Sequence, residues 1–311
     1  MIQFDQVEKK YPDGTQAVQQ LDLIIKKGEF FVLIGPSGCG KTTTLKMINR
    51  LIPISDGTLR IDGKKISEFD IHELRWNIGY VLQQIALFPH MTIAENIAVV
   101  PEMRKWNRSK ISRRVDELLE MVGLDPSVYR NRKPSELSGG QQQRIGVIRA
   151  LAADPEVILM DEPFSALDPI SREKLQDDLL ELQRKIQKTI VFVTHDMKEA
   201  IKLGDRLCVM KDGKVVQIGT PEEIIEHPAN DFVKSFIGSH DRIEGRKVKE
   251  VAVQFPIGLK EGRTISAGAP ISEALQLLAE TDVLIIEENG QLIGSVTRET
   301  IIQFLAGEVR A

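Results

Sequence analysis

The sequence predicts an α/β fold built on a parallel sheet, with a helical insertion and a small C-terminal α/β unit. Residues 30–34, 157–160 and 190–193 are uninterrupted runs of large apolar side chains. Such runs are typical of strands that are buried on both faces of a parallel sheet. Each run is followed by glycine-rich or polar residues, and ligands of open α/β sheets bind beyond the carboxyl ends of the strands. We therefore expect the functional residues to gather at one edge of this sheet.

Length, composition and charge are those of an ordinary globular chain. Of the 311 residues, 42% are hydrophobic and 28% are charged, and the formal net charge is -4 at pH 7. Without an excess of positive charge, the chain lacks the field that draws proteins to nucleic acid, so we expect no nucleic-acid partner. The two cysteines do not support a disulfide framework. The N-terminus has no signal pattern, and no apolar run approaches the roughly 18 residues that span a bilayer. Any work at a membrane would therefore go through a partner.

Residues 35–42 read Gly-Pro-Ser-Gly-Cys-Gly-Lys-Thr, which is the spacing of a phosphate-binding loop. Glycines let backbone N–H groups converge on phosphate oxygens, Lys41 adds a cation for the β- and γ-phosphates, and Thr42 offers a hydroxyl to Mg²⁺. A chance match is the alternative, but the buried strand directly before the loop is the context that the motif requires. The nucleotide-binding residues predicted here are Gly35, Pro36, Ser37, Gly38, Cys39, Gly40, Lys41, Thr42 and Thr43.

Acidic and imidazole side chains follow the other two predicted strands. Asp161 and Glu162 follow the 157–160 run, and His195 lies just beyond the 190–193 run. Beside a bound nucleotide, Asp161 is placed to hold Mg²⁺ through water, and Glu162 to orient or deprotonate an attacking water. His195 is placed to hydrogen-bond a γ-phosphate or Glu162. Taken alone, such an acidic pair can simply start a loop and such a histidine can cap a strand, but the phosphate loop favours catalysis.

A second glycine-rich turn precedes a predicted helix over Gln141–Ala153. Residues 137–144 read Leu-Ser-Gly-Gly-Gln-Gln-Gln-Arg. A serine and free N–H groups at the start of a helix form an anion-binding site. A single phosphate loop does not need this second site, so we expect the second site to serve a second nucleotide or a second subunit. The alternative is an ordinary serine N-cap with flexible glycines, which explains Ser138 but not the whole run.

The pattern changes twice along the chain. Residues from about 88 to 150 have helical periodicity and few β-branched runs, which predicts an inserted helical subdomain. The first domain is expected to cover residues 1–240. Residues 241–311 then predict a separate small domain, with a helix that opens at Pro270 and a hairpin across Asn289-Gly290.

Together these segments resemble the ATPase subunit of an ABC transporter. The resemblance covers residues 1 to about 240, in the family's order, and implies a P-loop NTPase (RecA-like) core. It rests on residues 35–42, Gln83, residues 137–144, residues 157–162, the Ser-Ala-Leu-Asp run at 165–168, and His195.

The resemblance implies roles for individual residues. Two copies would face each other head to tail, each holding ATP between its own phosphate loop and the partner's turn. That turn would contribute Ser138, Gly139, Gly140 and Gln141. Asp168 would lie at the dimer seam, Tyr11 would stack on adenine, and Gln83 would touch Mg²⁺ and sense the γ-phosphate. Glu162, His195 and Gln83 would be the catalytic residues, with ATP and Mg²⁺ as cofactors and Thr42, Gln83 and Asp161 at the metal.

The stretch that follows Gln83 resembles one subgroup of these ATPases. Gln84 stands where many importer ATPases carry an acid or serine, and Leu-Phe-Pro-His-Met follows at 87–91. This resembles importers of osmoprotectants such as glycine betaine, carnitine, choline and proline betaine. Phe88 to Met91 would then contact a transmembrane permease subunit. An extracytoplasmic solute-binding protein or domain would complete the complex, and the chain would lie peripherally at the cytoplasmic face of the cell membrane.

Other readings stay open at this stage. The chain could serve a different ABC importer, for amino acids, polyamines or metals, or be a soluble ABC-type ATPase that is not coupled to transport.

The tail resembles one cystathionine-β-synthase (CBS) motif, in residues 269–275, 283–287 and 290–297. Such motifs normally act in pairs. Either the tail would pair with its copy in the other subunit, or the second motif would be absent and the ability of the tail to sense a signal would be reduced. It would be a regulatory domain or only a dimerisation appendage.

Overall fold

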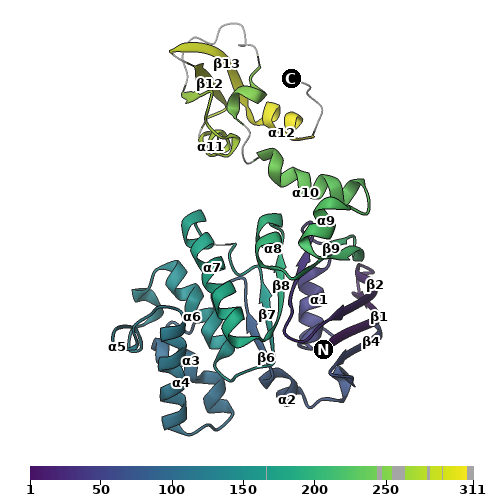
Figure 1. The fold of residues 1–311 in the computed structure, drawn as a ribbon, viewed down its shortest axis with the longest axis vertical. Coiled ribbons are helices and arrows are strands. Elements are labelled where there is room, and N and C mark those ends of the chain that lie inside the picture. Colours follow the sequence, from purple (N-terminus) through teal and green to yellow (C-terminus); the bar gives the residue numbers. More distant parts are fainter. Residues whose placement is uncertain (166, 244–246, 254–262, 279–280, 289, 307–311) are drawn as a thin grey trace. The chain divides into compact units, whose positions relative to one another are not determined.

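The computed structural model describes residues 1–311 except 166, 244–246, 254–262, 279–280, 289 and 307–311 (Figure 1). The chain forms two compact units, Met1–Ala229 and Asn230–Ala311. Among the described residues, none of the helices has the length and apolar character needed to cross a membrane.

A six-stranded sheet forms the centre of the first unit, in the order β10-β9-β3-β8-β7-β6. The three apolar runs are its strands β3, β7 and β8, which confirms the predicted buried strands: all of their residues are buried. These strands and β6 run parallel, whereas β10 pairs antiparallel with β9 at the edge. The bounds are β3 Phe30–Ile34, β6 Ile78–Val81, β7 Val157–Asp161, β8 Thr189–Thr194, β9 Arg206–Lys211 and β10 Lys214–Gly219.

A second, antiparallel sheet has the order β2-β1-β4-β5. Alternate side chains of its strands are buried, as in a sheet with one covered face. One continuous core joins both sheets to helix α1, and includes Phe4, Leu21, Leu45 and Leu159. These elements are β1 Ile2–Lys10, β2 Gln16–Ile25, β4 Asp56–Ile61, β5 Lys64–Lys65 and α1 Lys41–Ile48.

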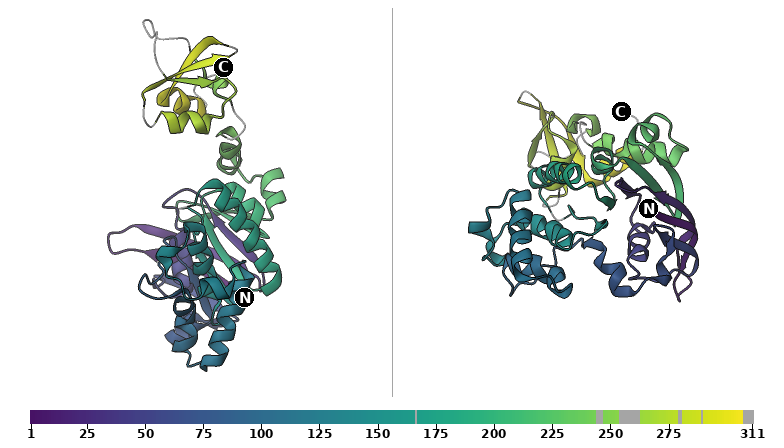
Figure 2. Two further views of the ribbon diagram at one scale, coloured as in Figure 1. Left: turned by 90° about the vertical axis from the view of Figure 1, so that its left-hand side faces the viewer. Right: turned by 60° about the horizontal axis from the view of Figure 1, so that its bottom comes forward.

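The predicted helical insertion gathers on the side of the first unit away from β1, β2 and β4 (Figures 1 and 2). It contains α3 Ile93–Met103, α4 Arg108–Met121, α5 Pro126–Tyr129 and α6 Gly139–Leu151. Helix α6 begins two residues before the predicted start because Ser138 is its N-cap. It ends two residues early, where Arg104 binds the carbonyl oxygen of Ala153 and Arg114 those of Leu151 and Ala152.

The first unit also contains the α-helices α2 Ile71–Trp76, α7 Pro169–Ile186, α8 Met197–Leu203 and α9 Pro221–Glu226. Helices α7 and α8 follow directly from the loops at the ends of β7 and β8, so they position the side chains of those loops. Each has an aspartate N-cap, Asp168 and Asp196 respectively.

The second unit has its own core and a three-stranded sheet in the order β11-β12-β13. Strands β12 and β13 form the predicted antiparallel hairpin, pairing Val283 with Thr297; its turn residue Asn289 lies outside the described residues. Strand β11, which pairs parallel with β12, was not anticipated from the sequence. The elements are α10 Asp231–Ile243, β11 Thr264–Ser266, α11 Ile271–Leu277, β12 Val283–Glu288, β13 Gln291–Thr297 and α12 Arg298–Ala306.

Candidate functional site

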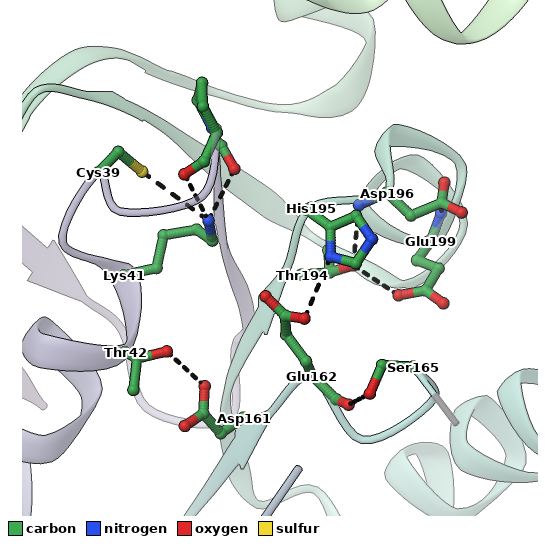
Figure 3. Close-up of polar contacts among 12 residues, drawn as sticks. Cys39, Lys41, Thr42, Asp161, Glu162, Ser165, Thr194, His195, Asp196 and Glu199 are labelled. Carbon is green, nitrogen blue, oxygen red and sulfur yellow. Dashed lines mark hydrogen bonds and ion pairs between the residues drawn. The ribbon is translucent and has the colours of Figure 1, made fainter. Parts of the chain in front are cut away.

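The carboxyl ends of β3, β8 and β7 lie side by side because these strands are hydrogen-bonded neighbours in parallel register. The phosphate loop follows β3, Asp161 ends β7, and His195 follows β8. Figure 3 shows these side chains around one space at the sheet edge. The fold therefore assembles residues from three separate parts of the sequence into one candidate site.

The phosphate loop has a backbone that only glycine fits at two positions. Gly35 and Gly40 have φ values of 155° and 99°. A Cβ at Gly35 would lie 2.2 Å from the carbonyl oxygen of Met210, and one at Gly40 would lie 2.3 Å from that of Ala17. Cys39 packs into the core, and burial raises the pKa of its thiol. Its role in the loop is therefore packing rather than nucleophilic chemistry.

Lys41 folds back over the loop that precedes it. Its Nζ donates to the carbonyl oxygens of Gly35 at 2.7 Å and Pro36 at 2.9 Å, and its side chain is buried (Figure 3). It also lies 3.9 Å from Sγ of Cys39, and a buried ammonium whose partners are all uncharged favours a nearby anion. Helix α1 starts at this lysine and has no side-chain cap on its first N–H groups. The loop thus combines a cation with free backbone donors, the chemistry of a phosphate site.

Two oxygen-bearing side chains meet beside the loop. The hydroxyl of Thr42 donates to Oδ1 of Asp161 at 2.7 Å. The hydroxyl of Tyr80, from β6, lies 3.4 Å from Oδ2 of the same carboxylate, and burial raises the pKa of Tyr80. A hydroxyl and a carboxylate suit Mg²⁺, which prefers oxygen ligands and keeps part of its water shell. The residues present therefore fit this ion.

Glu162 and His195 form the second polar pair of the site. Nδ1 of His195 lies 3.1 Å from Oε2 of Glu162 (Figure 3). Glu162 has a left-handed backbone, with φ of 43°, and its N–H donates to the carbonyl oxygen of Val193 at 3.0 Å. The carboxylate faces His195, which follows the end of β8 (Figure 3).

Three other predicted residues lie in loops or at a helix start of the first unit. Gln83 is exposed just beyond β6, and Asp168 caps α7. Hydrogen bonds from Ser171 lower the pKa of Asp168. Tyr11 lies in the turn before β2. Strand β2 carries Ala17, whose carbonyl oxygen packs next to Gly40 of the phosphate loop. Ala166, within the predicted 165–168 motif, lies outside the described residues.

The glycine-rich turn at the start of α6 makes only local contacts among the described hydrogen bonds. Ser138 accepts from the N–H of Gln141, and Gln141 binds back to Ser138 and to the hydroxyl of Tyr129. A Cβ at Gly139 would meet nothing within 4 Å, and one at Gly140 only Ser171 at 3.8 Å. The packing of a single chain therefore does not require glycine at either position.

Four residues of the site were not anticipated from the sequence: Tyr80, Thr194, Arg172 and Glu199. Tyr80 is part of a strand, and the other three surround His195. In the sequence alone, Tyr80 and Thr194 are indistinguishable from ordinary strand residues. Arg172 and Glu199 lie in the first turns of amphipathic helices, where charged residues are common. Only their proximity to Glu162 and His195 marks them.

Comparison with known protein families agrees with this geometry. Residues 18–165 match the model of the ABC transporter family, and residues 248–307 match that of the CBS domain. The first match ends just past Glu162, and the second covers most of the second compact unit.

Two relatives are about half identical to this chain over the aligned residues. It is 53% identical over 310 residues to the glycine betaine/carnitine/choline transport ATP-binding protein of Bacillus subtilis, covering 97% of this chain and 80% of the relative. It is 48% identical to the osmoprotectant import ATP-binding protein of Salmonella typhimurium, covering 96% and 79%.

A solved structure supports the same conclusion. The ATP-binding cassette MJ0796, in a dimeric post-hydrolysis state with ADP and Pi, has a TM-score of 0.63 and 38% identity, and covers 71% of this chain and 99% of that one. The chain therefore belongs to the ABC transporter family, as an ATP-binding subunit that hydrolyses ATP, and it also carries a CBS domain.

Proposed function

We propose that the chain powers the uptake of osmoprotectants, the small quaternary amines exemplified by glycine betaine, carnitine and choline. The observation that carries this proposal is the 53% identity to the Bacillus subtilis protein, which extends over 97% of the chain rather than over the nucleotide-binding core alone. The named substrates of the relatives differ within this class, so the proposal is for the class and not for one amine.

At the nucleotide, each residue has a proposed role. Lys41 and the backbone N–H groups of residues 35–42 bind the phosphates, and Tyr11 stacks on the adenine. Thr42, Asp161 and Gln83 hold Mg²⁺, which supplies positive charge to the β- and γ-phosphate oxygens. Glu162 aligns and deprotonates the attacking water, and His195 holds the Glu162 carboxylate in place at 3.1 Å.

A second copy of the chain completes each site. Its Ser138, Gly139, Gly140 and Gln141 contact the γ-phosphate that the first copy holds, and Asp168 lies at the seam. The support is that a Cβ would meet nothing within 4 Å at Gly139 and only Ser171, at 3.8 Å, at Gly140, so glycines there fit the close approach of a ligand from outside the chain. Binding energy from two nucleotides then drives closure of the pair.

Closure is passed to a transmembrane permease subunit through Phe88 and its neighbours, which places the chain at the cytoplasmic face of the membrane. Phe88 is 41% exposed. It borders a cavity of about 480 Å³ together with Leu82 and Arg149. Asn96 fixes its backbone by accepting from the Phe88 N–H at 2.8 Å and donating to its carbonyl oxygen at 3.1 Å. A rigidly held aromatic beside a cavity suits the docking of an apolar helix.

The second unit, with its CBS match, is proposed to regulate the complex or to strengthen its dimer.

Uptake in cells tests the substrate class. A strain that lacks its own osmoprotectant importers receives the chain with its native permease and binding components, and labelled glycine betaine, carnitine, choline, an amino acid and a polyamine are supplied under osmotic upshift. Uptake of at least one quaternary amine that disappears in the Glu162→Gln variant supports the proposal. Uptake of only the amino acid or the polyamine would contradict it.

A further inference from the structure

A small cavity lies behind the Glu162–His195 pair. Its volume is about 60 Å³, enough for one or two water molecules. Its lining includes Glu162 and His195 together with Arg172 and Glu199. The first two residues follow β7 and β8, whereas the other two come from helices α7 and α8. The cavity is thus lined both by the proposed catalytic pair and by residues of helices α7 and α8.

Glu199 is a buried carboxylate that is bound to the strand end carrying His195. Only 7% of its side chain is exposed. Its Oε2 accepts from the hydroxyl of Thr194 at 2.6 Å, and that hydroxyl accepts from the N–H of Asp196 at 3.0 Å (Figure 3). Thr194 and Asp196 flank His195 in the chain. Glu199 therefore fixes the backbone on both sides of the histidine through a single hydroxyl.

Arg172 connects this carboxylate to the turn before α7, which we call the α7 entry turn and define by Ser165, Leu167 and Asp168. One Nη of Arg172 donates to the carbonyl oxygen of Leu167 at 3.1 Å. Its Nε is buried, has no hydrogen-bond partner, and lies 4.0 Å from Oε1 of Glu199. An unpaired buried donor so close to a carboxylate can form a direct or water-bridged hydrogen bond after a small shift.

The other end of the α7 entry turn is attached to the catalytic carboxylate's own backbone. Both the N–H and the hydroxyl of Ser165 donate to the carbonyl oxygen of Glu162, at 3.3 and 3.0 Å. The turn therefore touches the Glu162–His195 pair along two routes. One runs directly through Ser165, and the other runs through Arg172, Glu199 and Thr194.

We propose that Arg172, Glu199 and Thr194 are positioning residues that transmit a displacement of the α7 entry turn to His195, and so align the Glu162–His195 pair when a second copy docks. This inference rests on the proposed function, because it assumes that Glu162 and His195 act on ATP and that Asp168 lies at the seam. A two-route connection lets docking at Asp168 shift the carboxylate and the imidazole together.

A neighbouring ion pair supplies a matched control. Lys202 of α8 and Asp177 of α7 lie 2.7 Å apart, so they join the same two helices. Their side chains are 32% and 62% exposed, and in their described contacts they touch neither the α7 entry turn nor Thr194. If Arg172 and Glu199 only brace α7 against α8, removal of the Lys202–Asp177 pair should have a similar effect on hydrolysis.

The test measures kcat and KM for ATP, nucleotide affinity with a fluorescent ATP analogue, and Tm, on the full-length chain. The variants are Glu199→Gln, Arg172→Gln, their double variant, Thr194→Val, Thr194→Ser and Asp177→Asn. Glu199→Gln keeps an acceptor for Thr194 but removes the charge that faces Arg172. Thr194→Val keeps the shape of the side chain and removes only the hydroxyl, which Thr194→Ser restores.

We expect Glu199→Gln, Arg172→Gln and Thr194→Val each to lower kcat between about twofold and thirtyfold, the range typical of coupling through contiguous side chains. KM and nucleotide affinity should stay within about twofold, Thr194→Ser should recover most of the native kcat, and Asp177→Asn should match the native chain. The double variant should lose no more than the worse single variant.

Three results would overturn the inference: native kcat in Glu199→Gln and Thr194→Val, an equal loss in Asp177→Asn, or additive losses in the double variant. Glu162→Gln is measured in the same assay. If that variant hydrolyses ATP at the native rate, the assignment of Glu162 as the catalytic base fails, whatever the other variants do. This result distinguishes a failure of the proposed function from a failure of the positioning proposal.

Discussion

Nδ1 of His195 lies 3.1 Å from Oε2 of Glu162, although the two residues follow different strands and are 33 positions apart in the sequence. Strands β7 and β8 are paired in parallel, so their ends deliver both side chains to the same edge. Glu162 is thus already oriented by a neighbour before a substrate is considered, which is the arrangement that a general base needs.

The Glu162→Gln variant should bind ATP but hydrolyse it about 10² to 10⁴ times more slowly, because an amide cannot take a proton from water. Phosphate release measures turnover, and size-exclusion chromatography with ATP and Mg²⁺ measures dimer formation. The variant should accumulate as an ATP-bound dimer. Native turnover would show that the base lies elsewhere, and a chain that stays monomeric at saturating ATP would contradict the shared site.

The Gly140→Ala variant should fold at least as well as the native chain but hydrolyse ATP at least tenfold more slowly. A methyl group at this position meets only Ser171 at 3.8 Å, and alanine favours a helix over glycine by roughly 0.5–1 kcal/mol. A methyl facing the partner's γ-phosphate would instead block closure.

Thermal unfolding and ATPase assays check both parts of this prediction. The matched control is Gly238→Ala, because Gly238 is a helical glycine of α10 with open space where a Cβ would lie, and this variant should leave hydrolysis unchanged. Native hydrolysis by Gly140→Ala would mean that no nucleotide closely approaches this turn.

The Tyr80→Phe variant should need more Mg²⁺, by up to about tenfold, for half-maximal ATPase activity. In the native chain the Tyr80 hydroxyl lies 3.4 Å from Oδ2 of Asp161. Residues that orient a metal ligand tune metal affinity even without touching the ion. The pKa of Tyr80 is raised, so the hydroxyl stays a donor at alkaline pH. Titration of activity with Mg²⁺ at saturating ATP checks this.

The matched hydroxyl deletion is Tyr129→Phe, because the Tyr129 hydroxyl contacts Gln141 rather than Asp161. Its Mg²⁺ midpoint should equal that of the native chain. Equal midpoints for Tyr80→Phe and the native chain would remove Tyr80 from the metal site.

The stability of Glu199→Gln should rise relative to the native chain as pH increases. Burial raises the pKa of Glu199 above its usual 4.5, so folding favours the protonated carboxyl. The stability that this group contributes is full below pH 4.5 and is lost as pH rises through the raised folded pKa. Glutamine does not titrate, so the Tm of the variant minus that of the native chain should grow from pH 4.5 toward neutrality.

Differential scanning calorimetry between pH 4.5 and 8 measures this trend. The control is Glu181→Gln, at an exposed site of α7 where Lys185 lowers the pKa of the carboxylate, and its Tm difference should not grow in the same way. A Tm difference for Glu199→Gln that is flat or falls with pH would mean that the buried carboxylate is stabilised as an ion.

Much of the fold was predictable because its signals are local. The apolar runs of β3, β7 and β8 indicate burial on both faces. The start of α6 was predicted only to within two residues, because the capping pair of Ser138 and Gln141 lets the helix begin at Gly139. The carbonyl groups at the C-terminal end of α6 are bound by Arg104, which caps α3, and by Arg114 of α4. The last residue of α6 could therefore not be predicted from the sequence of that helix alone.

The sequence by itself determined the phosphate loop, because glycine spacing and a lysine encode the conformation and the charge of residues 35–42 in one short segment. It also determined that one buried strand ends at Asp161 and that another is followed by His195. Only the tertiary structure decided which side chains meet: Thr42 with Asp161, 119 residues away, and Arg172 with Glu199. Those pairings depend on the order and register of parallel strands, which packing of the whole sheet and its helices selects and no local pattern specifies.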